Sequence, residues 1–100
     1  MNIIGGEKRG SKLALCASKA VRPTAQRTRE ALFNILQGGR FSFSLSKATV
    51  IDLFAGTGAI GLEALSRGAR SCVFVEQDQD ALQTLQANIS KLKLEDCAHI

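Results

Sequence analysis

A glycine-rich segment flanked by two acidic residues is the part of the sequence best suited to chemistry. Residues 56–61 read GTGAIG, which fits G-x-G-x-x-G, a pattern that many ordinary turns also satisfy. Here it follows the apolar run VIDLF and precedes a helical pattern. In a strand–loop–helix unit, such glycines let the backbone turn tightly and approach a ligand. The segment therefore predicts a loop that binds a nucleotide-like ligand.

The two acidic residues suggest which ligand this is. Glu76 lies 20 residues after Gly56, at the end of the next predicted strand, where dinucleotide enzymes and methyltransferases both hold ribose hydroxyls. Asp52 interrupts an apolar strand, and a buried carboxylate without a partner is costly. An ammonium group, such as that of S-adenosylmethionine, would pair with it. The alternatives are a carboxylate that caps a local turn for Asp52 and a solvated strand end for Glu76.

Three further acidic residues have simpler interpretations. Asp78 and Asp80 lie two and four residues after Glu76, and we expect them to cap the next helix. Glu63 lies in the helix after the glycine loop, and we expect a solvated position there. Since Asp52 and Glu76 should serve different ends of one ligand, they are not interpreted as a general acid and base.

The second half of the chain repeats one plan. Apolar runs that begin at Ala48, Ser71 and Cys97 read as strands. The helix between the first two ends near Gly68, and the next carries leucines and isoleucine at helical spacing at positions 82, 85, 89 and 92. The order strand–helix–strand–helix–strand predicts a parallel sheet with right-handed crossovers.

The first half has a different pattern. Residues 1–16 predict a hairpin with a polar turn near residues 7–10. Residues 22–37 predict a helix that starts at Pro23, with Thr24 as a cap, and ends at Gly38 and Gly39. Its predicted buried stripe comprises Ala25, Thr28, Leu32, Ile35 and Leu36, with Arg27, Glu30 and Asn34 on the opposite face.

Charge divides the chain near Lys47. Residues 1–47 hold nine Lys and Arg against two acids, a net +7, whereas residues 48–100 hold four against seven, a net −3. We therefore predict a basic segment, 1–47, and a ligand-binding domain, 48–100. A basic segment beside an acidic one suits a polyanionic partner and a small ligand, although a merely solvated basic surface is the alternative.

The chain has an odd number of widely spaced cysteines, Cys16, Cys72 and Cys97, and one histidine, His99. This set argues against a zinc site and against a disulfide framework. Cys72 and Cys97 are expected to be small core residues. No apolar run approaches the length of a membrane span, and the N-terminus lacks the apolar centre of a signal peptide. We expect a cytoplasmic protein of bacterial type that holds no metal.

The motifs together resemble a known family. VIDLFAGTGAIGLEALSRGA, VFVEQD, RPTAQRTREALFNIL and IIGGEKRGSKL resemble, in order, segments of the RsmD family of 16S ribosomal RNA guanine-N2 methyltransferases. The resemblance implies a Rossmann-like class I methyltransferase fold and S-adenosylmethionine as the cofactor. It places Asp52, Gly56, Gly58 and Glu76 in the cofactor pocket, with Thr24 near the methionine end, and Phe54 completes the predicted cofactor set.

The resemblance also implies an RNA partner, 16S rRNA or an assembling small ribosomal subunit, bound by a monomer. Arg9, Arg22, Arg27 and Arg29 would hold RNA or order the segment over the cofactor. Guanidinium groups suit bidentate phosphate contacts, which position a nucleic acid without reading its sequence. Against RNA contact, Arg27 could pair with Glu30, and Arg29 could stabilise its own helix.

One family motif does not occur. Related enzymes carry an Asn/Asp-Pro-Pro-aromatic motif at the end of a fourth strand, where it aligns the target amine, and Pro23 is the one proline here. We therefore assign no catalytic residue, interpret the sheet as truncated, and expect these 100 residues alone to be inactive. The alternatives are a fragment of an NAD-dependent oxidoreductase, a DNA amino methyltransferase, and a noncatalytic RNA-binding module.

Overall fold

A three-stranded parallel sheet forms the centre of the structure. The computed structural model describes residues 1–16, 25–38 and 44–100. The strands β1 (Thr49–Asp52), β2 (Ser71–Phe74) and β3 (Ala98–His99) lie in the order β1-β2-β3. In the register of the sheet, Asp52 pairs with Phe74 and Cys72 with Ala98. The predicted parallel strand–helix–strand–helix–strand unit is confirmed.

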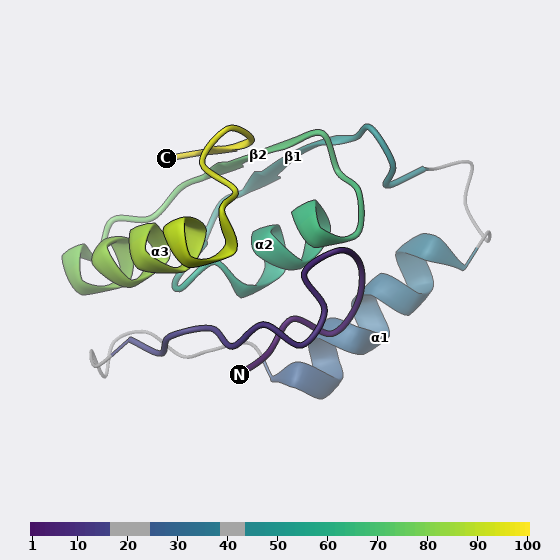
Figure 1. Cartoon of the computed structure of the whole chain (residues 1–100), viewed down its shortest axis with the longest axis horizontal. Helices are drawn as coiled ribbons and strands as arrows, with labels where there is room; N and C mark the ends of the chain where they lie inside the picture. The colour runs from purple at the N-terminus through teal and green to yellow at the C-terminus, as the bar shows by residue number, and fades with distance from the viewer. Residues whose placement is uncertain (17–24, 39–43) are drawn as a thin grey trace.

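Helices α2 (Ala59–Ser66) and α3 (Gln79–Leu92) cover one face of this sheet (Figure 1). Leu62 of α2, Leu85 of α3 and Phe74 of β2 are buried in one hydrophobic core. No element of the described chain covers the opposite face, where Ile51 is 63% exposed. The glycine loop is thus held between a strand and a helix that are fixed by a shared core.

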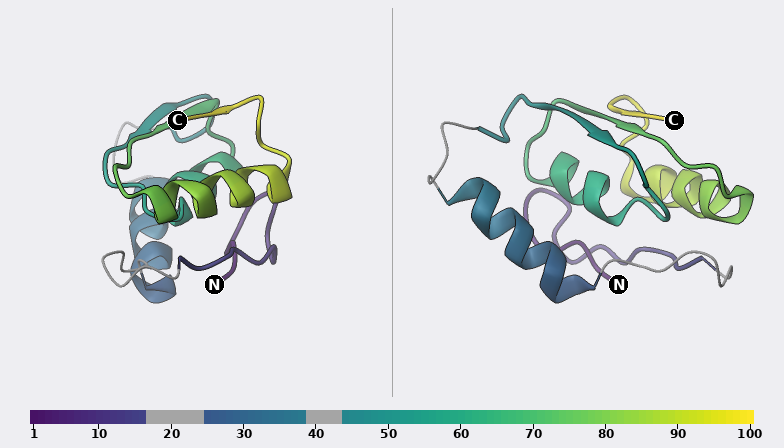
Figure 2. Two further views of the ribbon diagram at one scale, coloured as in Figure 1. Left: turned by 90° about the vertical axis from the view of Figure 1, so that its left-hand side faces the viewer. Right: turned by 180° about the vertical axis from the view of Figure 1, so that it is seen from behind.

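The N-terminal hairpin and helix α1 (Gln26–Gln37) form a further layer on the far side of α2 and α3 (Figure 2). The hairpin closes through an antiparallel bridge between Asn2 and Lys12. Ile3, Leu13 and Phe33 belong to the same core as the residues of α2. The hydrophobic core therefore continues across the predicted boundary near Lys47.

The predicted buried stripe of α1 is wrong except at Leu36, which is partly buried against the core. Arg29 and Phe33 are the buried residues of this helix, whereas Leu32 and Ile35 are 37% and 50% exposed. Arg29 and Phe33 share a helix face because they are four residues apart. The buried face of α1 therefore includes a charged residue, and a pattern of apolar residues cannot predict a buried arginine. Ala25 occupies the N-cap position, and the predicted cap, Thr24, lies outside the described residues.

Cys72 is a core residue, as predicted. Its side chain is completely buried, and burial raises the pKa of its thiol to about 12. The thiol therefore remains protonated at neutral pH, which suits a small packing residue rather than a reactive one. Cys97 is half-buried.

Asp78 caps α3, as predicted, whereas Asp80 lies within the first turn of the helix and is not its cap. One of its carboxylate oxygens accepts a hydrogen bond from the backbone N–H of Ala81 at 2.9 Å. Loss of this bond in Asp78→Ala is expected to lower the free energy of unfolding by about 1 kcal/mol, measured by urea denaturation. Asp80→Ala is the matched control, because it removes one negative charge from the same helix turn without removing a cap. Equal losses from the two variants would contradict the capping role.

Candidate cofactor site

The two predicted ligand-binding carboxylates lie at one edge of the sheet. Asp52 ends β1, and Glu76 follows the end of β2 by two residues. A carboxylate oxygen of Glu76 accepts a hydrogen bond from the backbone N–H of Gly56 at 2.8 Å. A carboxylate oxygen of Asp52 accepts one from the N–H of Gly61 at 3.3 Å. Both acids therefore contact the glycine loop, from its two flanks.

The geometry of the loop requires glycine at two positions. Gly58 precedes α2 with φ 92°, a left-handed conformation that side chains disfavour, and a Cβ there would lie 2.4 Å from Leu85 Cδ1. At Gly61, a Cβ would lie 2.3 Å from the ring of Phe74. The first glycine permits the turn, and the second permits close packing of helix on strand, as nucleotide-binding loops require.

Asp52 is a half-buried carboxylate without a cation. Burial raises the pKa of Asp52, the N–H groups of Gly61 and Phe54 oppose this shift, and the negative charge of Glu76 adds to it. The ion pairs found in the described parts of the chain all involve Glu63, and none involves Asp52. A positively charged ligand group would therefore offset a cost that this carboxylate carries in the free protein.

Glu76 has the opposite character. Its carboxylate accepts hydrogen bonds from the N–H groups of Asp78, Gln77 and Gly56. These bonds, with that of Asp78 the largest contribution, lower the pKa of Glu76. A carboxylate offers about four acceptor positions, so the three N–H bonds leave room for a ligand hydroxyl. Glu76 is thus a pre-oriented anion that suits a ribose.

A cleft of about 270 Å³ opens beside Glu76. It is lined by Leu53, Phe54, Val75, Glu76 and Gln77. Phe54 is 91% exposed, so its ring is available to a ligand. Of the predicted cofactor residues, Asp52, Phe54, Gly56, Gly58 and Glu76 therefore come together at one edge, and Thr24 lies outside the described residues.

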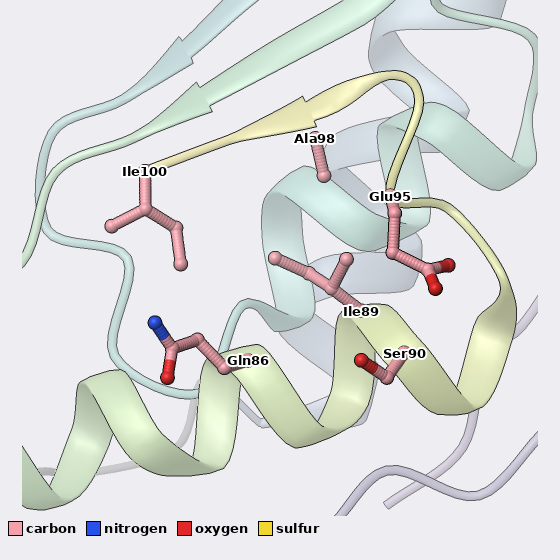
Figure 3. A pocket seen from close by; sticks show the side chains of 6 residues that line it. All are labelled: Gln86, Ile89, Ser90, Glu95, Ala98 and Ile100. Carbon is pink, nitrogen blue, oxygen red and sulfur yellow. The ribbon is translucent and has the colours of Figure 1, made fainter.

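A second cavity, of about 360 Å³, lies between α3 and β3 (Figure 3). It is lined by Gln86, Ile89, Ser90, Glu95, Ala98 and Ile100. None of the predicted cofactor residues borders this cavity, so it is separate from the cleft beside Glu76.

Within residues 1–16, 25–38 and 44–100, no three His, Cys, Asp or Glu side chains gather as a metal site would require. No helix in that part of the chain is long and apolar enough to cross a membrane.

The predicted RNA-binding arginines differ in exposure. Arg9 and Arg27 are exposed, and Arg22 lies outside the described residues. Arg29 is completely buried and forms an ion pair with Glu63 at 3.3 Å. The expectation that Arg29 contacts RNA is therefore wrong, because its guanidinium is enclosed by the hairpin and α2, where it also donates to the backbone carbonyl of Asn2.

Glu63 is likewise not solvated, as the sequence had suggested, but completely buried. Its two oxygens accept hydrogen bonds from the backbone N–H groups of Ile4 and Gly5, each at 2.9 Å, and one oxygen also binds Arg67 at 2.7 Å. The hairpin and α1, two segments distant in sequence, enclose Glu63 and supply three of its partners, Ile4, Gly5 and Arg29. The nearest sequence signal was the spacing of Glu63 and Arg67 on one helix.

A parallel sheet with a glycine loop after its first strand, and acids at the ends of its first two strands, defines a Rossmann-like fold of the class I methyltransferase type. Solved structures of methyltransferases share it. A putative methyltransferase, yhhF, from Escherichia coli superposes with a TM-score of 0.83 at 39% identity, over 99% of this chain and 49% of that one. The chain belongs to the family described as Conserved hypothetical protein 95, the RsmD family, whose match extends over residues 1–100.

Two curated relatives give the scale of the similarity. Ribosomal RNA small subunit methyltransferase D from Escherichia coli K12 is 44% identical over 93 residues, which is 93% of this chain and 44% of the relative. The putative rRNA methyltransferase YlbH from Bacillus subtilis is 40% identical over 98 residues, 94% of this chain and 48% of the relative. The chain thus spans about half the length of these relatives.

Proposed function

We propose that this chain is the S-adenosylmethionine-binding part of an enzyme that methylates the N2 amine of a guanine in small-subunit ribosomal RNA. The observation that carries the proposal is Asp52, a half-buried carboxylate without a cation beside a glycine loop. The names of the relatives, which describe small-subunit rRNA methyltransferases, support the reaction class. S-adenosylmethionine supplies an activated methyl group on a sulfonium when it is bound.

Each residue of the site has a proposed task. Asp52 pairs with the ammonium of the methionine part, and Glu76 accepts a ribose hydroxyl. The glycine loop brings its backbone close to the ligand, and the exposed ring of Phe54 offers an apolar contact. Because both acids already bind the loop, the ligand would meet a largely pre-oriented edge. An NAD-binding protein would have no ammonium for Asp52.

The proposed RNA contacts lie in the basic segment. Arg9 on the hairpin turn and Arg27 on the first turn of α1 are exposed. The family resemblance adds Arg22 to these RNA contacts. It also adds Thr24, near the methionine end, to the cofactor site. Phosphate contacts from these side chains would position RNA, and binding should weaken steeply with salt.

The ammonium contact is tested by Asp52→Asn, which keeps the shape and removes the charge. Hydrogen bonds to charged groups contribute about 1.5–3 kcal/mol, so affinity for S-adenosylmethionine should fall by roughly 10- to 100-fold in calorimetric titration. Asp80→Asn, an exposed acid outside the site, is the control. A deaminated cofactor analogue should bind the wild type and Asp52→Asn equally. Equal affinity of the wild type for the cofactor and for the deaminated analogue would contradict the proposed ammonium contact.

Acid should weaken cofactor binding through Asp52 before it does so through Glu76. The ammonium binds the ionised form of Asp52, whose pKa is raised by burial, so affinity is full above that raised pKa and falls as the pH drops through it. Glu76 has a lowered pKa and stays ionised to lower pH. Titrations between about pH 7.5 and 4.5 should show the decline in the wild type. The profile of Asp52→Asn should be nearly flat over the same range; an equally steep decline would assign the effect elsewhere.

A further inference from the structure

Asn88 is a completely buried amide in the middle of α3. Its neighbours along the inner face of the helix, Leu85, Ile89 and Leu92, are apolar core residues. An amide among such residues is costly unless its donors and acceptor are all bonded. A packing residue at this position would be expected to be apolar, so the contacts of Asn88 require an explanation.

The first contact holds the glycine loop. The Asn88 side-chain N–H donates to the carbonyl oxygen of Thr57 at 3.0 Å. Thr57 lies between Gly56 and Gly58 and is only 4% exposed. Because Glu76 binds Gly56 at 2.8 Å, two side chains fix consecutive residues of the loop. Asn88 fixes it from the side of α3, away from the ligand cleft.

The other contacts hold the N-terminal segment. Asn88 accepts a hydrogen bond from the backbone N–H of Ala14 at 2.7 Å and donates one to the carbonyl oxygen of Ala14 at 3.2 Å. The orientation of the amide is settled by these partners, because its oxygen faces an N–H and its nitrogen faces two carbonyls. Asn88 thus binds both backbone groups of Ala14, as a neighbouring strand would, and Figure 1 shows this segment passing beneath α3.

One side chain therefore joins the glycine loop at Thr57 to the N-terminal segment at Ala14. We infer that Asn88 is a positioning residue that couples cofactor binding at the glycine loop to ordering of the N-terminal segment at Ala14. The inference rests on the proposed function, because it takes the loop ligand to be S-adenosylmethionine. The link is reciprocal: whatever orders the segment at Ala14 strengthens cofactor binding by the same factor.

Hydrogen exchange in the wild-type chain tests the link without any substitution. Saturating S-adenosylhomocysteine, a stable product analogue, should slow exchange of the Ala14 amide at least about threefold more than that of the Gly10 amide. Gly10 is the internal reference because its N–H bonds Ile3 within the hairpin. General stabilisation slows both amides alike, so only the excess at Ala14 reports coupling. Equal slowing of the two amides would overturn the inference.

Asn88→Asp provides the second test, because it keeps the acceptor for Ala14 and replaces the donor with an oxygen that faces two carbonyls. Affinity for S-adenosylhomocysteine should fall about tenfold, and the excess protection at Ala14 should disappear. Ile89→Val, a mild core change on the next residue of α3, is the control and should keep wild-type affinity. A purely structural role would lower the melting temperature of both variants and leave the affinity of both unchanged, which would overturn the inference.

The outcomes separate the two proposals. Wild-type binding without coupling at Ala14 would leave the proposed function intact and remove the role of Asn88. The absence of any binding by the folded wild type would overturn both. If Asn88→Asp does not fold, the exchange measurement on the wild type decides.

Discussion

Replacement of Glu63 by glutamine is expected to lower the free energy of unfolding by about 3–5 kcal/mol, as for other buried ion pairs that lose one partner. Glu63 is completely buried and accepts hydrogen bonds from Ile4, Gly5 and Arg67, and it neutralises Arg29. A glutamine amide would turn donors toward N–H groups that need an acceptor. It would also leave the Arg29 guanidinium buried without a counter-charge.

Of the two arginines paired with Glu63, Arg29 would lose more of its stabilising contacts than Arg67 if Glu63 were neutralised. Burial lowers the pKa of Arg29, and the charge of Glu63 opposes that shift. Two side-chain nitrogens of Arg29, Nε and Nη1, have no hydrogen-bond partner in the described structure. Nε is nevertheless paired by charge with Glu63 Oε1, at 3.3 Å. The remaining side-chain nitrogen of Arg29 donates to the carbonyl of Asn2. Arg67 also donates to Gln37 and lies 4.9 Å from the centre of the Phe33 ring. Most of the lost stability should therefore come from leaving the buried charge of Arg29 without a counter-charge.

Urea denaturation of Glu63→Gln measures the effect. Glu95→Gln is the control, because Glu95 is exposed and its neutralisation should change stability by less than about 0.5 kcal/mol. The double variant Glu63→Gln with Arg29→Met should recover part of the loss, since it removes the stranded charge. A loss below about 1 kcal/mol for Glu63→Gln, or no recovery in the double variant, would contradict the proposed role of the pair.

Alanine at Gly6 should destabilise the protein by about 3 kcal/mol, whereas alanine at Gly10 should cost only about 1 kcal/mol. Both glycines have left-handed backbones, with φ of 81° and 85°, so both substitutions incur the same strain of about 1 kcal/mol. A Cβ at Gly6 would lie 1.9 Å from the backbone oxygen of Ser66, whereas at Gly10 no atom lies within 4 Å. The hairpin would have to move away from the end of α2, and the overpacking adds about 1–3 kcal/mol.

Comparison of the two glycine variants separates the energy of packing the hairpin against the end of α2 from the energy of backbone strain in the hairpin turn. Ser66 binds this hairpin through three contacts, since its carbonyl accepts from Glu7, and its hydroxyl accepts from Lys8 and donates to Gly5. Thermal or urea unfolding of the two variants should give the difference directly. Equal losses at the two positions would show that the hairpin does not depend on this close approach.

Much of the second half could be predicted from local patterns. Apolar runs, the glycine loop and the leucine spacing of α3 each act within one element, so they predicted the parallel sheet and both crossover helices. The proximity of Asp52 and Glu76 also followed from sequence, because neighbouring parallel strands end at the same edge. What the sequence could not indicate is that Glu76 binds Gly56 directly, since that contact depends on the turn of the loop.

The errors concern polar residues that are buried by distant partners. Glu63 and Arg29 are both completely buried. Arg29 donates to the carbonyl of Asn2, 27 residues away, and Glu63 accepts from the N–H of Ile4, 59 residues away. Hydrophobic periodicity counts only apolar side chains, so it missed Arg29 on the buried face of α1 and placed Glu63 in solvent. One clue was available: the sequence of α2, AIGLEALS, is apolar on all sides, which is typical of a buried helix.

Titration of the purified protein with S-adenosylmethionine and, separately, with NAD is the most direct test of the proposed cofactor site. Isothermal calorimetry should show saturable binding of S-adenosylmethionine, weakened in Asp52→Asn and retained in Asp80→Asn, and no binding of NAD. Saturable binding of NAD by the folded protein, without binding of S-adenosylmethionine, would contradict the assignment of the glycine loop and of Asp52.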